Sequence, residues 1–265
     1  MLIDTHCHLT HGRLRNQLVA VLDRAAEADV GIIIAATGHI ADSHAAARLA
    51  NSHENIYCTA GVHPHDAKDV AADYLDRLAE LAGGDKCVAI GEIGLDYHHD
   101  FSPRPAQREI FAAQLDLAVR LGTPVAIHTR EALGDTLAIL ADAGIDGERL
   151  SFHSFTGDAD DVRRLIDLDA YVGYSGIATF KRTDDIRAGA ALVPAERIMV
   201  ETDAPYLSPE PVRKMKTNEP ANVRHVAQCL AAARGASFED FAEQTTANAL
   251  RFFGIELLAA PARHP

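Results

Sequence analysis

Short runs of apolar and β-branched residues alternate with longer amphipathic segments along the chain. Eight such runs occur, and their length and their valine and isoleucine content predict strands that are buried on both faces. The predicted strands span residues 2–8, 30–37, 56–63, 87–96, 124–129, 149–155, 170–176 and 197–203.

The segments between the runs place apolar residues at helical spacing. This pattern predicts helices over residues 14–28, 105–121, 131–143 and 237–254. Gly122 and Gly144 follow the second and third of these segments, and glycine commonly ends a helix. The last segment begins with Ser237, a residue that caps helices, and stops at Gly254.

Strand and helix alternate eight times over about 250 residues, which is the arithmetic of a (β/α)₈ barrel. We therefore predict an α/β protein with a TIM-type barrel, as a single domain over residues 1–258 with a frayed tail over 259–265. A doubly wound open sheet is the alternative, but no glycine-rich G-x-G-x-x-G loop follows the first strand to favour it.

Composition narrows the functional classes. The net charge of −13 argues against broad electrostatic binding of nucleic acid or anionic membranes, but a local site whose positive charge comes from metal ions stays open. No apolar run is long enough to span a membrane, and no segment resembles a secretory signal. The four cysteines are widely spaced without a C-x-x-C pair, which predicts reduced thiols in a cytoplasmic protein.

Residues that can bind metal interrupt or end the predicted strands. Successive side chains of a strand alternate between faces, so His6 and His8 at the end of the first strand share one face. In a barrel, the carboxyl ends of the strands meet at one opening. We therefore expect six side chains from five strands to converge there: His6, His8, Glu92, His128, His153 and Asp203.

Four imidazoles and two carboxylates need a cation to be buried together. This donor set binds Zn²⁺, Mn²⁺ or Mg²⁺, and six ligands exceed what one structural zinc uses. Two divalent ions bridged by a carboxylate fit better, as in many hydrolytic sites. The sequence therefore predicts a hydrolase with two divalent metal ions as cofactors.

Six motifs resemble the signature blocks of one protein family. In chain order, "DTHCHL", "GVHPHDA", "AIGEIGLDYH", "PVAIHTREA", "FHSFTGD" and "VETDAPYLSP" resemble those of the TatD family of metal-dependent deoxyribonucleases, which belongs to the amidohydrolase-like barrels. "NEPANV" and "TANALRFFG" resemble its closing segments, so the resemblance runs from residue 1 to about residue 253. It implies a TIM-type barrel with two divalent metals. His6, His8 and Asp203 would hold one ion, His128 and His153 the other, and Glu92 would bridge them.

The resemblance also implies exonuclease-like hydrolysis of phosphodiester bonds, with single-stranded DNA as the usual substrate. No protein partner is implied, and the composition predicts no membrane association. The mechanism that we expect is in-line attack on phosphorus by a water molecule that the two cations have made acidic. Asp203 would accept the proton of that water, and Glu92 would hold both cations in place. Asp203 and Glu92 are thus the predicted catalytic residues.

Three further residues are predicted to bind substrate. His63 follows the third strand and, as an imidazolium, could bind a phosphate oxygen; the alternative is a histidine that caps its loop. His65 is a second candidate for the same role. Arg130 could clamp a phosphate, or it could pair with Asp135 instead. Asp96 is expected to support the site rather than to bind metal.

Other interpretations remain open at this point. The same site could hydrolyse carbonyl esters, lactones or amides, including aminoacyl esters on RNA, or it could be a metal-binding scaffold without catalytic activity. The chain has Thr10 and Thr217 where the family commonly has an aspartate and a basic residue. These two differences concern substrate contacts rather than the metals. His98 and His99 receive no predicted role.

Overall fold

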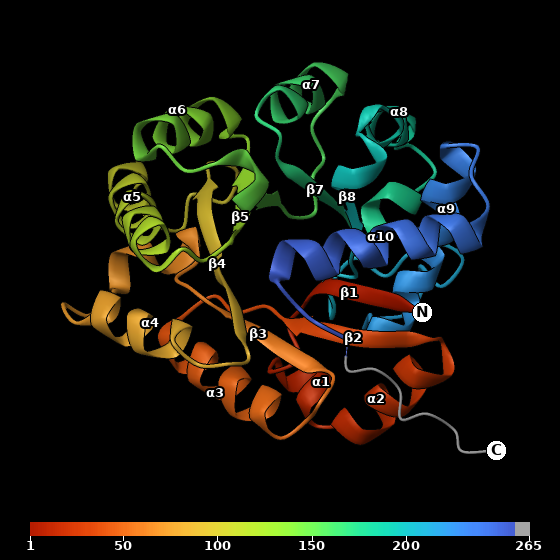
Figure 1. Cartoon of the computed structure of the whole chain (residues 1–265), viewed down its shortest axis with the longest axis horizontal. Helices are drawn as coiled ribbons and strands as arrows, with labels where there is room; N and C mark the ends of the chain where they lie inside the picture. Colours follow the sequence, from red (N-terminus) through yellow and green to blue (C-terminus); the bar gives the residue numbers. More distant parts are fainter. Residues whose placement is uncertain (258–265) are drawn as a thin grey trace.

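The computed structural model describes residues 1–257, and the predicted tail over 259–265 lies outside them. Its centre is a sheet of eight parallel strands in the order β1 to β8, as predicted, with the helices arranged around it (Figure 1). The strands are β1 (Leu2–Cys7), β2 (Val30–Ala35), β3 (Ile56–Ala60), β4 (Cys87–Asp96), β5 (Val125–Arg130), β6 (Leu150–Phe152), β7 (Tyr171–Tyr174) and β8 (Ile198–Val200).

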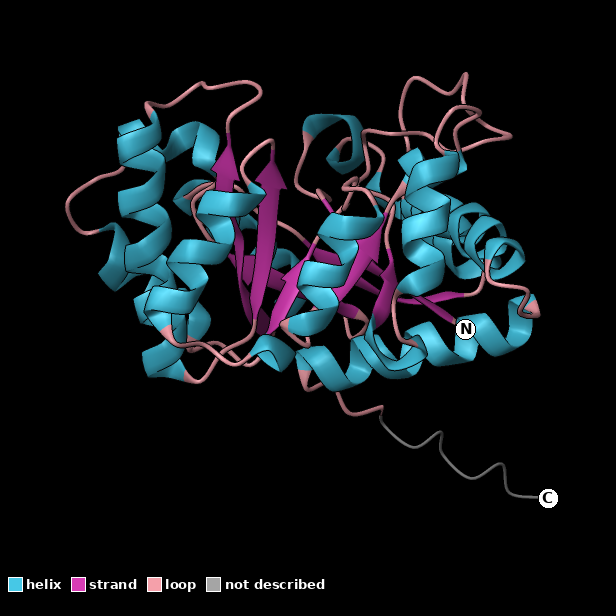
Figure 2. Cartoon of the chain, turned by 90° about the horizontal axis from the view of Figure 1, so that it is seen from above, coloured by secondary structure: helices cyan, strands magenta, loops and turns pink. Residues whose placement is uncertain are grey.

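Helices cover the outside of the strands (Figure 2), and because each strand is parallel to its neighbour, the strands end on the same side of the barrel. The α-helices are α1 (Gly12–Arg15), α2 (Leu18–Glu27), α3 (Ile40–Asn51), α4 (Tyr74–Ala82), α5 (Arg104–Leu121), α6 (Leu133–Ala143), α7 (Ala159–Asp167), α8 (Asp184–Leu192), α9 (Val223–Ala233) and α10 (Phe238–Phe253). Short 3-10 turns are η1 (Pro64–Asp69), η2 (Gly147–Arg149), η3 (Gly176–Thr179), η4 (Ala195–Arg197) and η5 (Pro220–Asn222). In the described residues, no helix combines the length and the apolar character needed to span a bilayer.

One predicted helix is wrong in its continuity. The structure divides residues 14–28 into α1 and α2, because Gln17 leaves the helical conformation with φ −134° and ψ 30°. Leu14 is the buried residue of α1, whereas Val21 and Ala25 form the buried face of α2. The apolar stripe that the sequence shows is therefore real, but two short helices present it.

The buried apolar residues of the strands and helices form two clusters. The larger cluster lies between strands and helices, and the smaller joins β-strand residues such as Ile3 and Ile32 to Phe252 and Phe253 of α10. Because Ile3 and Ile32 lie early in their strands, α10 packs against the end of the barrel where the strands begin. Polar chemistry is thereby left to the opposite end.

The first and last strands meet at what we call the β1–β8 seam. Asp203 N–H donates to the carbonyl of His6 at 2.9 Å, but side chains supply much of the remaining contact. The carboxylate of Asp4 accepts bonds from the N–H of Thr202 at 2.8 Å and from its hydroxyl at 2.6 Å. Thr5 Oγ1 donates to the carbonyl of Val200 at 3.1 Å. The seam brings His6 next to Asp203, although they are almost 200 positions apart in the chain.

Candidate metal centre and active site

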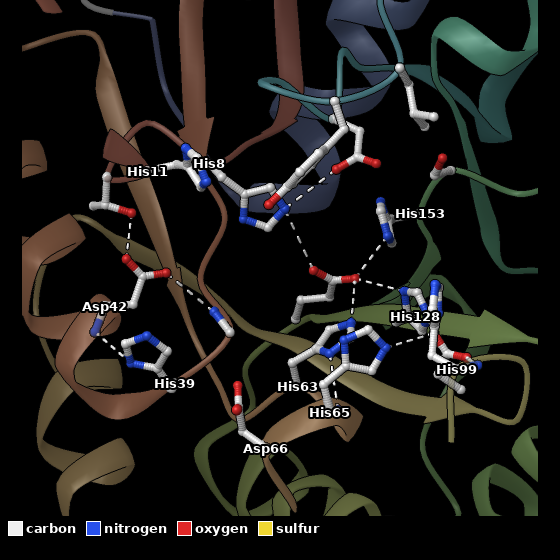
Figure 3. Close-up of a pocket in the computed structure, with 18 of the residues that line it drawn as sticks. His8, His11, His39, Asp42, His63, His65, Asp66, His99, His128 and His153 are labelled. Carbon is white, nitrogen blue, oxygen red and sulfur yellow. Dashed lines mark hydrogen bonds and ion pairs between the residues drawn. The ribbon is translucent and has the colours of Figure 1, made fainter. Parts of the chain in front are cut away.

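A cavity of about 930 Å³ opens where the strands end. Figure 3 shows His8, His63, His128 and His153 in this cavity, all directed toward a common centre. The residues that line it include, among others, His8, His11, His39, Asp42, His63, His65, Glu92, Asp96, His99, His128, Arg130, His153, Asp203 and Tyr206.

The carboxylate of Glu92, on β4, occupies that centre, and each of its oxygens faces a different set of imidazoles. Oε2 lies 3.4 Å from His6 Nε2 and 3.9 Å from His8 Nε2. Oε1 faces three rings: His128 Nδ1 at 2.8 Å, His153 Nε2 at 2.8 Å and His63 Nε2 at 3.4 Å. Five imidazoles thus surround one buried carboxylate and are divided between its two oxygens, and this set of side chains suits metal binding.

His6, His8 and Asp203 form the side of the site nearest the seam. His8 Nε2 lies 3.4 Å from Asp203 Oδ1, and Asp203 adopts the left-handed backbone conformation with φ +55°. His6 Nε2 is buried and has no hydrogen-bond partner among residues 1–257, while the His6 ring stacks on that of His153 at 3.8 Å. A buried nitrogen without a hydrogen-bond partner is costly unless it binds something else.

His153 is oriented by a residue that the sequence analysis missed. Its Nδ1 lies 3.1 Å from Oε1 of Glu201, a buried carboxylate that also accepts a bond from Ser154 N–H at 2.5 Å. The other oxygen of Glu201 accepts from Thr5 Oγ1 at 3.1 Å. A signal was present, because "RIMVETD" places an acid inside an apolar strand two residues before Asp203. Carboxylates of this kind fix the tautomer of metal-binding histidines.

His63 has the loop-capping geometry that was the alternative prediction. Its Nδ1 accepts a bond from His65 N–H at 3.1 Å at the start of η1. Burial lowers the pKa of His63 to about 4, although Glu92 opposes the shift. The imidazole is therefore neutral at neutral pH rather than the imidazolium that we expected, and its Nε2 carries the proton.

Asp96, at the end of β4, collects a second group of imidazoles. Its Oδ1 accepts bonds from the backbone N–H groups of His98 and His99. Its Oδ2 lies 2.8 Å from His99 Nδ1, 2.9 Å from His65 Nε2 and 3.2 Å from His128 Nε2. Burial raises the pKa of Asp96, but the bonds from His128 and His65 outweigh it and hold that pKa well below its usual value.

Arg130 lies exposed at the edge of the cavity. The alternative partner predicted for it, Asp135, pairs instead with Arg108 at 3.2 Å. Thr10, where the family commonly has an aspartate, also lines the cavity and donates a hydrogen bond to Asp42. Arg130 is thus placed to meet a ligand that enters the cavity.

The charges of the site favour cations. Burial raises the pKa of Glu92, but the surrounding histidines, His153 foremost, lower it well below its usual value. Burial also raises the pKa of Asp203, but the hydrogen bond with His8 outweighs burial and holds that pKa below its usual value. Four groups in the described residues have donor atoms within 4.8 Å of one another, as a metal site requires: His6, His8 and Asp203; His6, His153 and Glu201; His63, Glu92 and His128; His65, Asp96 and His99.

Known proteins resemble this chain over almost its whole length. A family model described as TatD related DNase matches residues 3–254. YabD of Bacillus subtilis (strain 168), named an uncharacterized metal-dependent hydrolase, is 36% identical over 255 residues, which are 96% of this chain and 100% of YabD. A protein of Pantoea ananatis named 3'-5' ssDNA/RNA exonuclease TatD is 37% identical over 261 residues, covering 96% of this chain and 100% of that protein. The crystal structure of YJJV, a TatD homolog from Escherichia coli K12, superposes with a TM-score of 0.90 at 28% identity and covers 96% and 98% of the two chains.

Proposed function

Because the chain belongs to the family of TatD-related DNases, we propose that it is a metal-dependent hydrolase that cleaves phosphodiester bonds of nucleic acid, with single-stranded DNA as its preferred substrate and exonuclease-like action. The observation that carries the proposal is the position of Glu92, whose two oxygens face separate sets of imidazoles at the floor of an open cavity. The name of the Pantoea relative, an exonuclease on single-stranded DNA and RNA, supports this substrate class.

We infer two divalent cations as cofactors. The residues fit them, because His6 Nε2 is buried without a hydrogen-bond partner among the described residues and points toward Glu92. His6, His8 and Asp203 would hold one ion, His128 and His153 the other, and Glu92 would bridge them. When bound, the two cations would supply Lewis acidity, which makes a water molecule acidic at neutral pH and stabilises negative charge on a phosphate.

The side chains of the protein contribute orientation and proton transfer. Glu201 accepts the Nδ1 proton of His153, and Asp96 accepts the Nε2 proton of His128, so with cations bound each ring would offer its other nitrogen, which faces Glu92, as an unprotonated metal ligand. Asp203 is ionised at neutral pH and lines the cavity, so it can accept the proton of the attacking water.

Substrate contacts come from the rim. His63 carries its proton on Nε2 and can donate it to a phosphate oxygen without being charged. Arg130 can bind a phosphate with two parallel hydrogen bonds. His65 was the third predicted contact, but its Nε2 lies 2.9 Å from Asp96 Oδ2 and faces that carboxylate.

The test is a substrate comparison with the purified protein after removal and controlled reloading of metal. End-labelled single-stranded DNA, RNA, a lactone, an amide and an aminoacyl ester would be assayed with Mg²⁺, Mn²⁺ or Zn²⁺. We expect cleavage of nucleic acid that a chelator abolishes. We expect Asp203→Asn to lower kcat by about 10²- to 10⁴-fold, the range for loss of a general base. Asn tolerates the left-handed backbone of this position, so the fold should persist.

Asp116→Asn is the matched control, since Asp116 lies exposed on α5. It should keep full activity. Cleavage of DNA by Asp203→Asn at the parental rate would refute the catalytic role of that carboxylate. Turnover confined to the carbonyl substrates would move the assignment to the alternative hydrolase activity. No turnover of any substrate by metal-loaded protein would favour the non-catalytic scaffold.

We also infer that the protein acts in the cytoplasm. The four cysteines are unpaired, which fits a reducing compartment.

A further inference from the structure

A cluster at the wall of the cavity is not used by the proposed catalytic pair of cations. It consists of His65 in η1, Asp96 at the end of β4 and His99 in the loop between β4 and α5. Figure 3 shows His65 and His99 close to His128 and on its far side from His153. We call these three residues the Asp96 cluster. None of them is among the ligands proposed for the catalytic pair.

One oxygen of Asp96 carries too many nitrogen partners for hydrogen bonding alone. The Oδ1 atom is already satisfied by the backbone N–H groups of His98 and His99. The Oδ2 atom faces His99 Nδ1 at 2.8 Å, His65 Nε2 at 2.9 Å and His128 Nε2 at 3.2 Å. A carboxylate oxygen has two lone pairs, so it cannot accept well-directed bonds from three rings.

His128 has the first claim on one of those lone pairs. Its two nitrogens face two carboxylates, Glu92 at 2.8 Å and Asp96 at 3.2 Å, so Nε2 carries a proton and donates it to Asp96. This leaves His65, His99 and one lone pair of Oδ2. A cation in place of two protons would let both rings and the carboxylate act as donors at once.

We propose that the Asp96 cluster is a third divalent-cation site, with His65 Nε2, Asp96 Oδ2 and His99 Nδ1 as ligands. Two imidazoles and one carboxylate favour Zn²⁺ or a similar transition ion over Mg²⁺, which prefers oxygen ligands. The donor atoms all lie within 4.8 Å of one another. The inference goes beyond the proposed function, since the site could fill or stay empty whatever the catalytic pair does.

The local structure can adjust to the ion. Zinc bonds of about 2.0–2.1 Å in tetrahedral geometry place ligands about 3.3 Å apart, so both rings would move away from Oδ2 by about half an ångström. His65 and His99 can do so, because their side chains are 27% and 36% exposed whereas Asp96 is fully buried. Both rings line the cavity, so a fourth coordination position faces the substrate space. A site with three protein ligands and an open position can take water or an anionic group of a ligand.

The phenyl ring of Phe101 packs against both imidazole rings of the Asp96 cluster. It lies edge-on to His65 with ring centroids 4.7 Å apart and tilted against His99 at 5.2 Å. Phe101 therefore shields part of both rings from water, while their cavity side stays open. Such a cover strengthens ion binding, because it limits competing solvation.

The test counts metal ions in the full chain. Purified protein would be stripped with a chelator, loaded with Zn²⁺ or Co²⁺, dialysed and analysed for metal by mass spectrometry. We expect His99→Gln and His65→Gln each to bind one equivalent fewer than the parent, and to lose one component of the visible Co²⁺ spectrum. His53→Gln is the matched control, because His53 lies at the end of α3 and bonds to the carbonyl of Leu49.

Glu92→Gln separates this proposal from the proposed function. It removes the bridging carboxylate of the catalytic pair, and we expect one equivalent of Zn²⁺ to remain, which a second substitution His99→Gln removes. Equal metal content in the parent, His99→Gln and His65→Gln overturns the third site and leaves a hydrogen-bonded cluster. Loss of all metal in either single variant also overturns it, because the site would not be separate.

Crystals soaked in Zn²⁺ give a direct readout. An anomalous-scattering peak within bonding distance of Asp96 Oδ2 and both rings is the expected result. Peaks only beside Glu92 would refute the third site while leaving the catalytic pair intact.

Discussion

Glu201→Gln removes one charge from the support of the metal centre and leaves its shape unchanged. Oε1 of Glu201 accepts bonds from His153 Nδ1 and Ser154 N–H, and a glutamine oxygen can accept both. The glutamine NH₂ would take the place of Oε2 beside Thr5 Oγ1, whose own proton can go to the carbonyl of Val200. Every polar group therefore keeps a partner, and we expect the variant to fold.

The magnitude follows from the role of the carboxylate. Without its charge, the His153 ring becomes a weaker donor toward the cation. Loss of such a supporting partner typically costs about 10- to 100-fold in metal affinity, which corresponds to about 1.4–2.7 kcal/mol. Because His153 faces only one oxygen of Glu92, one of the two proposed cations should bear most of the loss. At a fixed excess of metal, stabilisation of the fold by that ion should fall by the same free energy.

The assay is Zn²⁺ titration against a competing chelator, together with thermal unfolding at several metal concentrations. Glu196→Gln serves as the matched control, since Glu196 is exposed in η4 and its loss changes the net charge equally. Its affinity should equal that of the parent. An affinity of Glu201→Gln within threefold of the parent for every equivalent would refute the reasoning.

Further predictions concern pH, packing and substrate binding. Burial opposes protonation of His153, but Glu92 and Glu201 raise its pKa well above the usual value. The stability that this ring gives is complete below pH of about 6.5 and is lost as pH rises through the raised pKa. The metal-free protein should therefore lose stability in calorimetry as pH rises above about 6.5; a flat or rising profile contradicts this, and metal-loaded protein should show no such loss. Gly94→Ala should lower the free energy of unfolding in urea by at least about 2 kcal/mol, because φ is +142° and the added Cβ would lie 1.9 Å from a backbone oxygen of β5. Gly134 lies in open space on α6, so Gly134→Ala should cause no such loss. Equal stability of the two variants would refute this account. Arg130→Gln should raise KM for single-stranded DNA with little change in kcat and should lower the salt slope of binding by roughly one, whereas an unchanged slope would remove Arg130 from the phosphate contacts.

The barrel was predictable because its signal is local. Each strand is a short apolar run and each helix an apolar stripe, so neither depends on distant partners. The carboxyl ends of parallel strands meet at one end of a barrel, so the sequence alone predicts that His128 and His153 lie near Glu92, as they do in the structure. The break at Gln17 escaped because the apolar stripe continues across it.

What sequence reasoning missed depends on contacts between distant elements. The role of Glu201 emerges only when the end of β8 comes near the end of β6 across β7, because its partners are His153 and Ser154. The role proposed for His99 depends on where β4 ends, because the turn after it brings the His99 ring back onto Asp96. The neutral state of His63 depends on burial that no local pattern reports.

The β1–β8 seam gives the first proposed cation a second task. His6 and His8 belong to the first residues of the chain, and Asp203 follows the last strand. An ion held by all three would therefore link the first strand to the last and hold the barrel closed. A nascent chain on the ribosome lacks Asp203 until nearly four fifths of its residues have been synthesised. The protein would therefore acquire that ion late in its synthesis, when the last strand completes the barrel.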